Sequence, residues 1–154
     1  MERFIELDAE DRLLEDAINM AFELLYANDK YLIDHQVNER SIVFRFAHYL
    51  QSELEKTKKY RRYNLDCEYN RNMDGPKIIH EGEPGVYPDL IIHRRGNNNN
   101  NLLIIEFKTY WNNDTTEDES KIREFVRMDR NYKYKYGFSI VFMLNYPKVK
   151  QITR

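Results

Sequence analysis

Two carboxylates and one lysine interrupt apolar segments in the middle of the chain. Asp89 lies within residues 86–94, and Glu106 and Lys108 lie within residues 101–110. Charged side chains in such segments are costly to bury unless they pair with one another or bind a metal ion. Two carboxylates on neighbouring strands can hold a hard divalent cation, and a nearby lysine can orient water or balance phosphoryl charge. These residues predict a metal site for phosphoryl chemistry or, alternatively, a buried structural ion pair.

Hydrophobic periodicity and turn signals predict the elements that position these residues. Apolar residues recur at helical spacing in three segments: residues 8–27, 38–57 and 117–134. Four segments have the composition or alternation of strands: residues 63–71, 86–94, 101–110 and 138–145. In the third helix, the residues expected to face inward are Ile122, Phe125, Val126 and Met128, whereas Lys121 is expected on the other face.

This order of elements predicts an α/β fold with three layers, α/β/α. The helix between the third and fourth strands allows those two strands to run parallel through a right-handed crossover, while the first three form an antiparallel meander. The expected sheet is therefore mixed, with about four strands between helices. We expect a single domain, residues 1–154, in which residues 36–146 form the core and residues 1–35 a helical extension.

The spacing of the charged residues resembles a known motif. Pro88-Asp89, followed after 16 residues by Glu106-Phe107-Lys108, is similar to the PD-(D/E)xK motif of the restriction-endonuclease-like nuclease superfamily. The predicted element order over residues 38–145 also resembles the core of that superfamily. Further stretches are similar to small stand-alone prokaryotic and phage members: residues 66–71, 93–96 and 101–103. The resemblance implies a restriction-endonuclease-like core with an extra N-terminal helix, and a metal-dependent endonuclease.

The resemblance also implies a role for each residue of the motif. Asp89 and Glu106 would be metal ligands, with the backbone carbonyl of Phe107 as a further ligand, and Lys108 would be the catalytic lysine. Superfamily members often place another acid in the first core helix, where Glu39 falls in this chain. Alternatively, Glu39 is an acid favoured by the helix dipole. The implied cofactor is Mg²⁺ or Mn²⁺, and the implied partner is nucleic acid, DNA in particular.

Four other residues are candidates for supporting the site or contacting the substrate. Glu68 lies in the first predicted strand, and His93 shares the predicted face of the second strand that carries the metal ligand. Arg45 and His48 lie three residues apart on a predicted helix, which allows both to face one phosphate. The alternative for each is an ordinary surface or packing residue.

Composition limits the classes of protein to consider. The 154 residues are 42% hydrophobic and 32% charged, which is typical of a globular domain. The lack of a membrane-length apolar segment, the absence of a secretory signal and the single cysteine predict a cytoplasmic protein with no membrane partner. Residues 1–40 contain 4 Lys/Arg and 11 Asp/Glu, whereas residues 41–154 contain 20 and 15. A polyanion is therefore expected to bind the second part.

Three functions remain open from the sequence. The first is the nuclease, and the second is a catalytically inactive nucleic-acid- or protein-binding module on the same fold. The third is a protein-interaction partner that uses the acidic first helix. Leu14, Ile18 and Leu25 form an apolar stripe on that helix, which predicts a homodimer interface. The presence of all three motif residues favours the nuclease.

Overall fold

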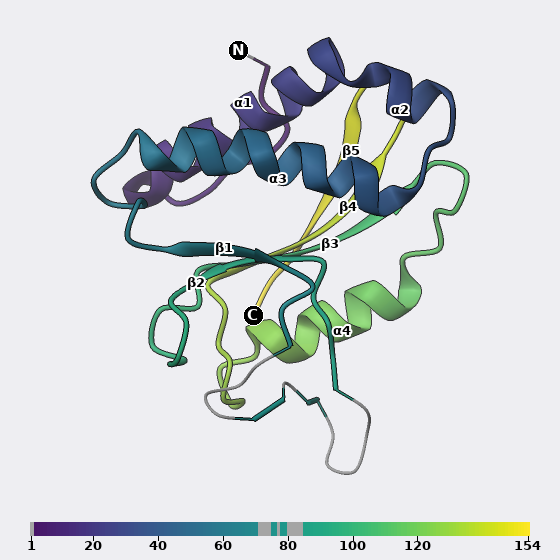
Figure 1. Ribbon diagram of the computed structural model, residues 1–154. Coiled ribbons are helices and arrows are strands. Elements are labelled where there is room, and N and C mark those ends of the chain that lie inside the picture. The colour runs from purple at the N-terminus through teal and green to yellow at the C-terminus, as the bar shows by residue number, and fades with distance from the viewer. Residues whose placement is uncertain (1, 71–74, 77, 80–84) are drawn as a thin grey trace. The chain divides into compact units, whose positions relative to one another are not determined.

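The computed structural model describes residues 2–70, 75–76, 78–79 and 85–154. It is an α/β structure with several helices and a mixed five-stranded sheet in the order β1-β2-β3-β4-β5 (Figure 1). The helical elements are η1 (Ala9–Asp11), α1 (Arg12–Asn28), α2 (Lys30–Asp34), α3 (Glu39–Glu55) and α4 (Thr116–Val126). The strands are β1 (Asn64–Cys67), β2 (Leu90–His93), β3 (Leu103–Thr109), β4 (Tyr136–Phe142) and β5 (Pro147–Ile152). Within the described residues, no helix has the length and apolar character needed to cross a membrane.

The chain divides into two compact units. The first contains Met1–Arg62, Phe107–Asn113 and Val141–Val149, and the second contains Tyr63–Glu106, Asp114–Ile140 and Lys150–Arg154. Strands β3, β4 and β5 each contribute residues to both units.

In the first unit, α1 and α3 lie side by side (Figure 1). The rings of Phe22 and Phe46 join the two helices, with centroids 4.5 Å apart. Leu14, Ile18 and Leu25 of α1 are fully buried within the chain. The prediction that this stripe forms a dimer interface is therefore wrong, because its apolar surface is already removed from solvent in one copy.

The start of α3 agrees with the sequence prediction. Asn38 caps α3, and its side-chain oxygen accepts a hydrogen bond from the backbone N–H of Arg40 at 2.8 Å. This bond satisfies one of the N–H groups that a helix start leaves without an intrahelical partner. The predicted helix at residues 8–27 corresponds to η1 followed by α1, so both N-terminal helices are confirmed.

The first three strands of the sheet form the predicted antiparallel meander in the second unit. Leu65 of β1 lies opposite Ile92 of β2, and Ile91 of β2 lies opposite Ile104 of β3. Ile91 and Ile104 share a buried core with residues of α4. The alternation of side chains therefore turns one face of these strands toward that helix.

Two of these strands are shorter than predicted. Asp89 lies one residue before β2 rather than inside it, and it follows Pro88, which has no N–H to donate to a strand ladder. Strand β1 ends at Cys67, since Glu68 adopts a left-handed backbone with φ of 51°. The predicted end of this strand, Arg71, lies outside the described residues.

Helix α4 ends eight residues earlier than predicted. Arg127 is extended, with ψ of 134°, and the chain then turns back so that the N–H of Tyr134 donates to the carbonyl of Phe125 at 3.0 Å. Ile122 and Phe125 are buried as predicted. The inward placement of Met128 is wrong, since this residue lies beyond the helix and its side chain is exposed.

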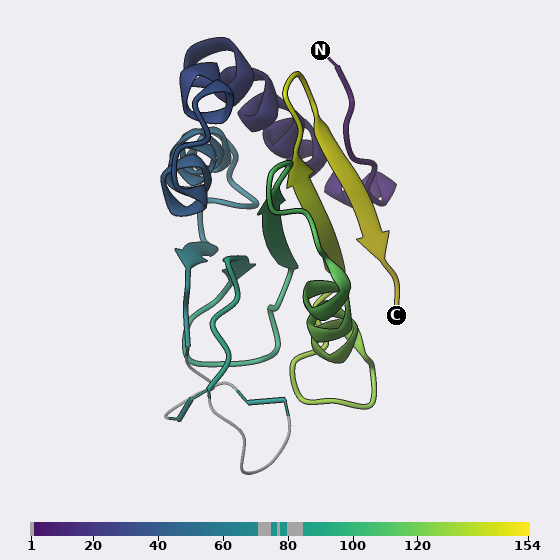
Figure 2. The same ribbon diagram turned by 90° about the vertical axis from the view of Figure 1, so that its right-hand side faces the viewer.

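The predicted count of four strands is corrected to five by β5, which runs beside β4 at an edge of the sheet (Figure 2). The N–H of Met143 donates to the carbonyl of Tyr146 at 3.1 Å in the turn between these strands. Strand β5 begins at Pro147. A proline is compatible with the first residue of an edge strand, because its missing N–H costs no ladder bond there.

Candidate functional site

Alternation along β3 gives its neighbouring side chains different surroundings. The ring of Phe107 packs against Phe46 and Phe142, with centroid distances of 5.4 and 5.0 Å. The side chain of Glu106 points to the other face of the strand, where Ile104 joins the core formed with α4. Glu106 is therefore a carboxylate enclosed by apolar packing, with a relative exposure of 2%.

Asp89 and Glu106 meet across the hairpin of β2 and β3. Leu90 pairs with Ile105 in the antiparallel register, so the residues on either side of that pair, 89 and 106, also face one another. Their side chains are joined by a hydrogen bond. The carbonyl of Asp89 accepts a further bond from the N–H of Glu68 at 3.3 Å, which ties the end of β1 to the same place.

A hydrogen bond between two carboxyl groups requires a proton on one of them. Burial raises the pKa of Glu106 well above 4.5, and the negative charge of Asp89 raises it further. The pair therefore holds one proton between its two carboxyl groups and keeps one negative charge, which faces Lys121. Two adjacent acids share a proton because their negative charges repel each other. A positive charge beside them would reduce this repulsion and favour ionisation of both.

Lys121 of α4 supplies positive charge to this pair. Its Nζ lies 3.2 Å from Oε1 of Glu106, and its side chain is partly buried. Burial is the largest single cause and acts to lower the pKa of Lys121. The interactions with Glu106 and the nearby acids Asp118 and Asp89 together outweigh burial and raise that pKa, so the side chain remains an ammonium. The charge of Asp118, another buried acid of α4, also raises the pKa of both groups.

The sequence prediction had placed Lys121 on the outer face of its helix, and this placement is wrong. Only apolar residues were used to define the inward face. Lys121 lies three residues after Asp118 and four before Phe125, both of which are buried. Residues at these spacings are neighbours on a helix surface, so this periodicity is the signal that finds the lysine.

Three of the residues predicted to act in catalysis or metal binding belong to the first unit, whereas the carboxylate pair belongs to the second. Glu39 is the first residue of α3. Lys108 lies two residues after Glu106 in β3, half-buried and on the same face of the strand. Phe107, whose carbonyl is the predicted further ligand, lies between them. The roles assigned to these residues stay predictions.

His93 is held in a cluster of its own. Its Nε2 lies 2.7 Å from Oδ2 of Asp66, and Nε of Arg95 donates to the same oxygen at 3.0 Å. Burial would raise the pKa of Asp66, but these two hydrogen bonds outweigh it and lower the pKa to about 2. The ring of His93 also meets Tyr69 edge-on at 4.7 Å. These contacts favour a packing role for His93.

Arg45 and His48 lie on α3 in the first unit. The guanidinium of Arg45 contacts Oδ2 of Asp29 at 3.0 Å and donates to the hydroxyl of Tyr49 at 2.9 Å. His48 is exposed and meets the ring of Tyr49 edge-on. The charge of Arg45 is therefore already matched by a carboxylate of its own unit.

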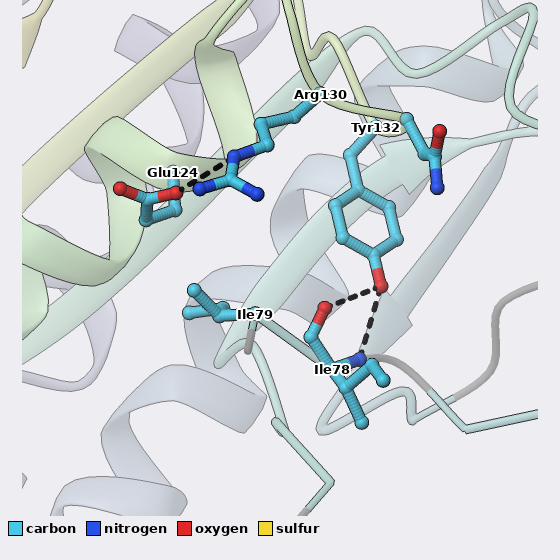
Figure 3. A pocket seen from close by; sticks show the side chains of 6 residues that line it. Ile78, Ile79, Glu124, Arg130 and Tyr132 are labelled. Carbon is cyan, nitrogen blue, oxygen red and sulfur yellow. Dashed lines mark hydrogen bonds and ion pairs between the residues drawn. The ribbon is translucent and has the colours of Figure 1, made fainter. Parts of the chain in front are cut away.

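The second unit also contains a cavity of about 220 Å³, lined by Ile78, Ile79, Glu124 and residues 130–132 (Figure 3). Figure 3 shows contacts within two pairs of these residues. Nε of Arg130 lies 3.2 Å from Oε2 of Glu124, and the hydroxyl of Tyr132 donates to the carbonyl of Ile78 at 2.8 Å. Contacts among the lining residues therefore stabilise the walls of the cavity. None of the predicted site residues lines it.

The carboxylate pair fits a hydrated divalent cation better than a closed metal cage. Mg²⁺ usually keeps several waters and is bound by one or two carboxylates together with substrate phosphates. In the part of the chain that the structure describes, no group of three or more His, Cys, Asp or Glu is arranged to hold a metal ion. Asp89 and Glu106 alone supply the number of acids that such an open site uses.

Comparison of the chain with models of protein families, with curated proteins and with solved structures found no match in any of the three. The functional argument therefore rests on the residues and contacts of the chain.

Proposed function

We propose that this chain is a metal-dependent nuclease that hydrolyses phosphodiester bonds, with DNA as its substrate. The observation that carries the proposal is the hydrogen-bonded pair of Asp89 and Glu106, one of which is almost fully buried. Two acids held together in a largely apolar environment oppose their own ionisation. A divalent cation would relieve this opposition and allow both to ionise.

Each residue has a defined part in the proposed hydrolysis. Asp89 and Glu106 bind Mg²⁺ or Mn²⁺, with the carbonyl of Phe107 as a further ligand. When bound, the cation would polarise the scissile phosphate and make water a better nucleophile. Lys108 orients the attacking water and balances charge on the phosphoryl oxygens. A bond forms between the water oxygen and phosphorus, the P–O ester bond breaks, and the departing oxygen takes a proton.

The order of elements supports a three-layer, restriction-endonuclease-like core as part of this proposal. Helix α3 is followed by the antiparallel strands β1, β2 and β3, then by α4 and β4. The three motif residues fall just before the second of these strands and within the third.

A second candidate function is a catalytically inactive nucleic-acid- or protein-binding module on the same fold. The observation that favours it is the contact between Lys121 and Glu106, which already neutralises part of the acidic cluster. Buried ion pairs of this kind also occur where no chemistry takes place. A protein of this second class would show no metal-dependent cleavage.

The deciding experiment is a cleavage assay with Mg²⁺ or Mn²⁺ on single- and double-stranded DNA and on RNA. We expect cleavage by the wild type and a loss of at least about a hundredfold in Glu106→Gln and Lys108→Met, since each removes a group that acts on the reacting phosphate. Circular dichroism should show that both variants remain folded.

Two surface variants provide matched controls. Glu119→Gln and Lys150→Met change the same charges in a different ion pair, whose members lie 2.7 Å apart. Both should cleave at the wild-type rate. Equal cleavage by the wild type and the two site variants, or no cleavage with either metal, would contradict the nuclease and favour the binding module.

A further inference from the structure

The ammonium of Lys121 occupies part of the coordination space that a metal ion would need. Its Nζ approaches Oε1 of Glu106 to 3.2 Å, although the sequence motif contains no residue of α4. Glu106 is almost fully buried, so few other directions of approach to its oxygens are open. A cation is therefore already built into the candidate metal centre.

Two further acids, Asp89 and Asp118, also act on Lys121. A divalent cation at the pair would be attracted by the same acids. It would, however, lie within a few ångströms of the ammonium, and repulsion between cations at such distances is strong in a low-dielectric environment.

We propose that Lys121 is a built-in counter-cation that holds Glu106 in the metal-free protein and competes with the divalent cation for it. Lys121 is thus a positioning residue, and metal entry requires its side chain to move away from Glu106. The flexible four-carbon stem and the 26% exposure of the side chain permit this movement. The inference rests on the proposed function for the identity of the metal ligands, but not on cleavage.

The test is a calorimetric titration with Mn²⁺, without nucleic acid. Removing the ammonium removes its repulsion of the metal, so Lys121→Met should bind Mn²⁺ at least about tenfold more tightly than the wild type. Lys121→Arg keeps the charge and should bind as the wild type does. Lys150→Met removes a surface ammonium of the second unit, from the 2.7 Å pair with Glu119, and should also leave the affinity unchanged.

A second set of variants assigns the effect to the pair. The gain in Mn²⁺ affinity should disappear in the double variant Lys121→Met with Glu106→Gln, because that variant lacks a proposed metal ligand. Lys121→Gln, which is also neutral, should reproduce the tighter binding of Lys121→Met. If neither neutral variant folds even with Mn²⁺ present, the ammonium is a structural requirement that a divalent cation does not replace, and the inference is overturned.

Three further results would overturn it: no Mn²⁺ binding by the wild type, binding by folded Lys121→Met that is equal or weaker, or an equal gain in Lys150→Met. Failure of the nuclease is recognised separately. Wild-type protein that binds Mn²⁺ and shows the expected gain in Lys121→Met, yet cleaves neither DNA nor RNA, contradicts the proposed function and leaves the competition by Lys121 intact.

Discussion

Glu106 is the residue whose surroundings decide the chemistry of the candidate site. Burial and the charge of Asp89 favour its protonated form, whereas Lys121 favours the carboxylate. The pKa of Glu106 is raised well above 4.5 on balance. Its proton is therefore more tightly bound in the folded chain than in the unfolded chain, and this difference links folding to pH.

We expect Glu106→Gln to stabilise the protein at pH 8. Because the raised pKa makes the folded state hold its proton longer, the free energy of unfolding of the wild type should fall as the pH rises from about 4.5 through the folded pKa. Glutamine has no proton to lose and keeps hydrogen-bonding capacity, so the variant should gain on the order of 1 kcal/mol at pH 8. Urea unfolding at pH 5 and pH 8 measures the effect. A variant that loses stability equally at both values would refute this account.

The protonation of Asp66 affects the free energy of unfolding in the opposite direction to that of Glu106. Its pKa is lowered to about 2, so the stability that it contributes is present above its usual value of 3.8 and is lost as the pH falls through about 2. Asp66→Asn should destabilise the protein at pH 7 by about 1–2 kcal/mol. The shift of nearly two pKa units, at about 1.4 kcal/mol each, is reduced because solvent screens the exposed partner Arg95. Unfolding curves at pH 7 and pH 2.5 should show the difference shrinking at low pH. A constant difference would show that packing rather than charge is responsible.

At the scale of elements, α4 and β4 approach each other closely at Gly137. A methyl group on Gly137 would lie 2.8 Å from Cγ1 of Val126 and closer still to Cγ2 of Ile122. The absence of a side chain at this position therefore lets β4 pack against the helix that carries Lys121. The geometry of the candidate site depends on this packing, because α4 places the ammonium beside the strands.

Gly137→Ala should lower the free energy of unfolding by about 1–3 kcal/mol, because overpacked cores force side chains and backbone to shift. Chemical denaturation measures this loss. Ile122→Ala removes Cγ2, the atom nearest to the new methyl group. In that background, Gly137→Ala should therefore lower the free energy of unfolding by a smaller amount. Equal costs in the two backgrounds would show that the helix contact is not the cause.

At the scale of the whole molecule, a bound metal would stabilise the fold as well as the site. A ligand that binds only the folded state raises the free energy of unfolding by about 2.7 kcal/mol at a hundred times its dissociation constant. The metal ligands join β3 to the end of the loop before β2, so binding would also connect segments distant in sequence.

Mn²⁺ should therefore raise the melting temperature of the wild type, and this gain should be greater at pH 8 than at pH 5.5. The sign follows from the raised pKa of Glu106, since its proton must leave before both carboxylates bind the metal. Differential scanning calorimetry measures the temperatures, and titrations in two buffers of different ionisation enthalpy measure the proton released. Asp89→Asn is the control, and it should respond to Mn²⁺ at neither pH.

Local pattern was sufficient to predict most of the elements. Helical spacing predicted α1 and α3, and apolar segments predicted the hairpin of β2 and β3, because these signals are properties of neighbouring residues. The early end of α4 was missed, since the reversal after Arg127 is fixed by the contact of Tyr134 with Phe125. Strand β5 was missed because its pairing with β4 is not encoded within its own six residues.

The sequence by itself determined the two acids and the strands that bring them together, since residue type and strand spacing suffice to identify Asp89 and Glu106. Only the tertiary structure decided that Lys121 contacts Glu106. The sequence analysis placed Lys121 on the outer face of its helix, whereas its Nζ lies 3.2 Å from Oε1 of Glu106. The physical reason is that charge interactions depend on distance in space, and packing of a helix against strands sets that distance.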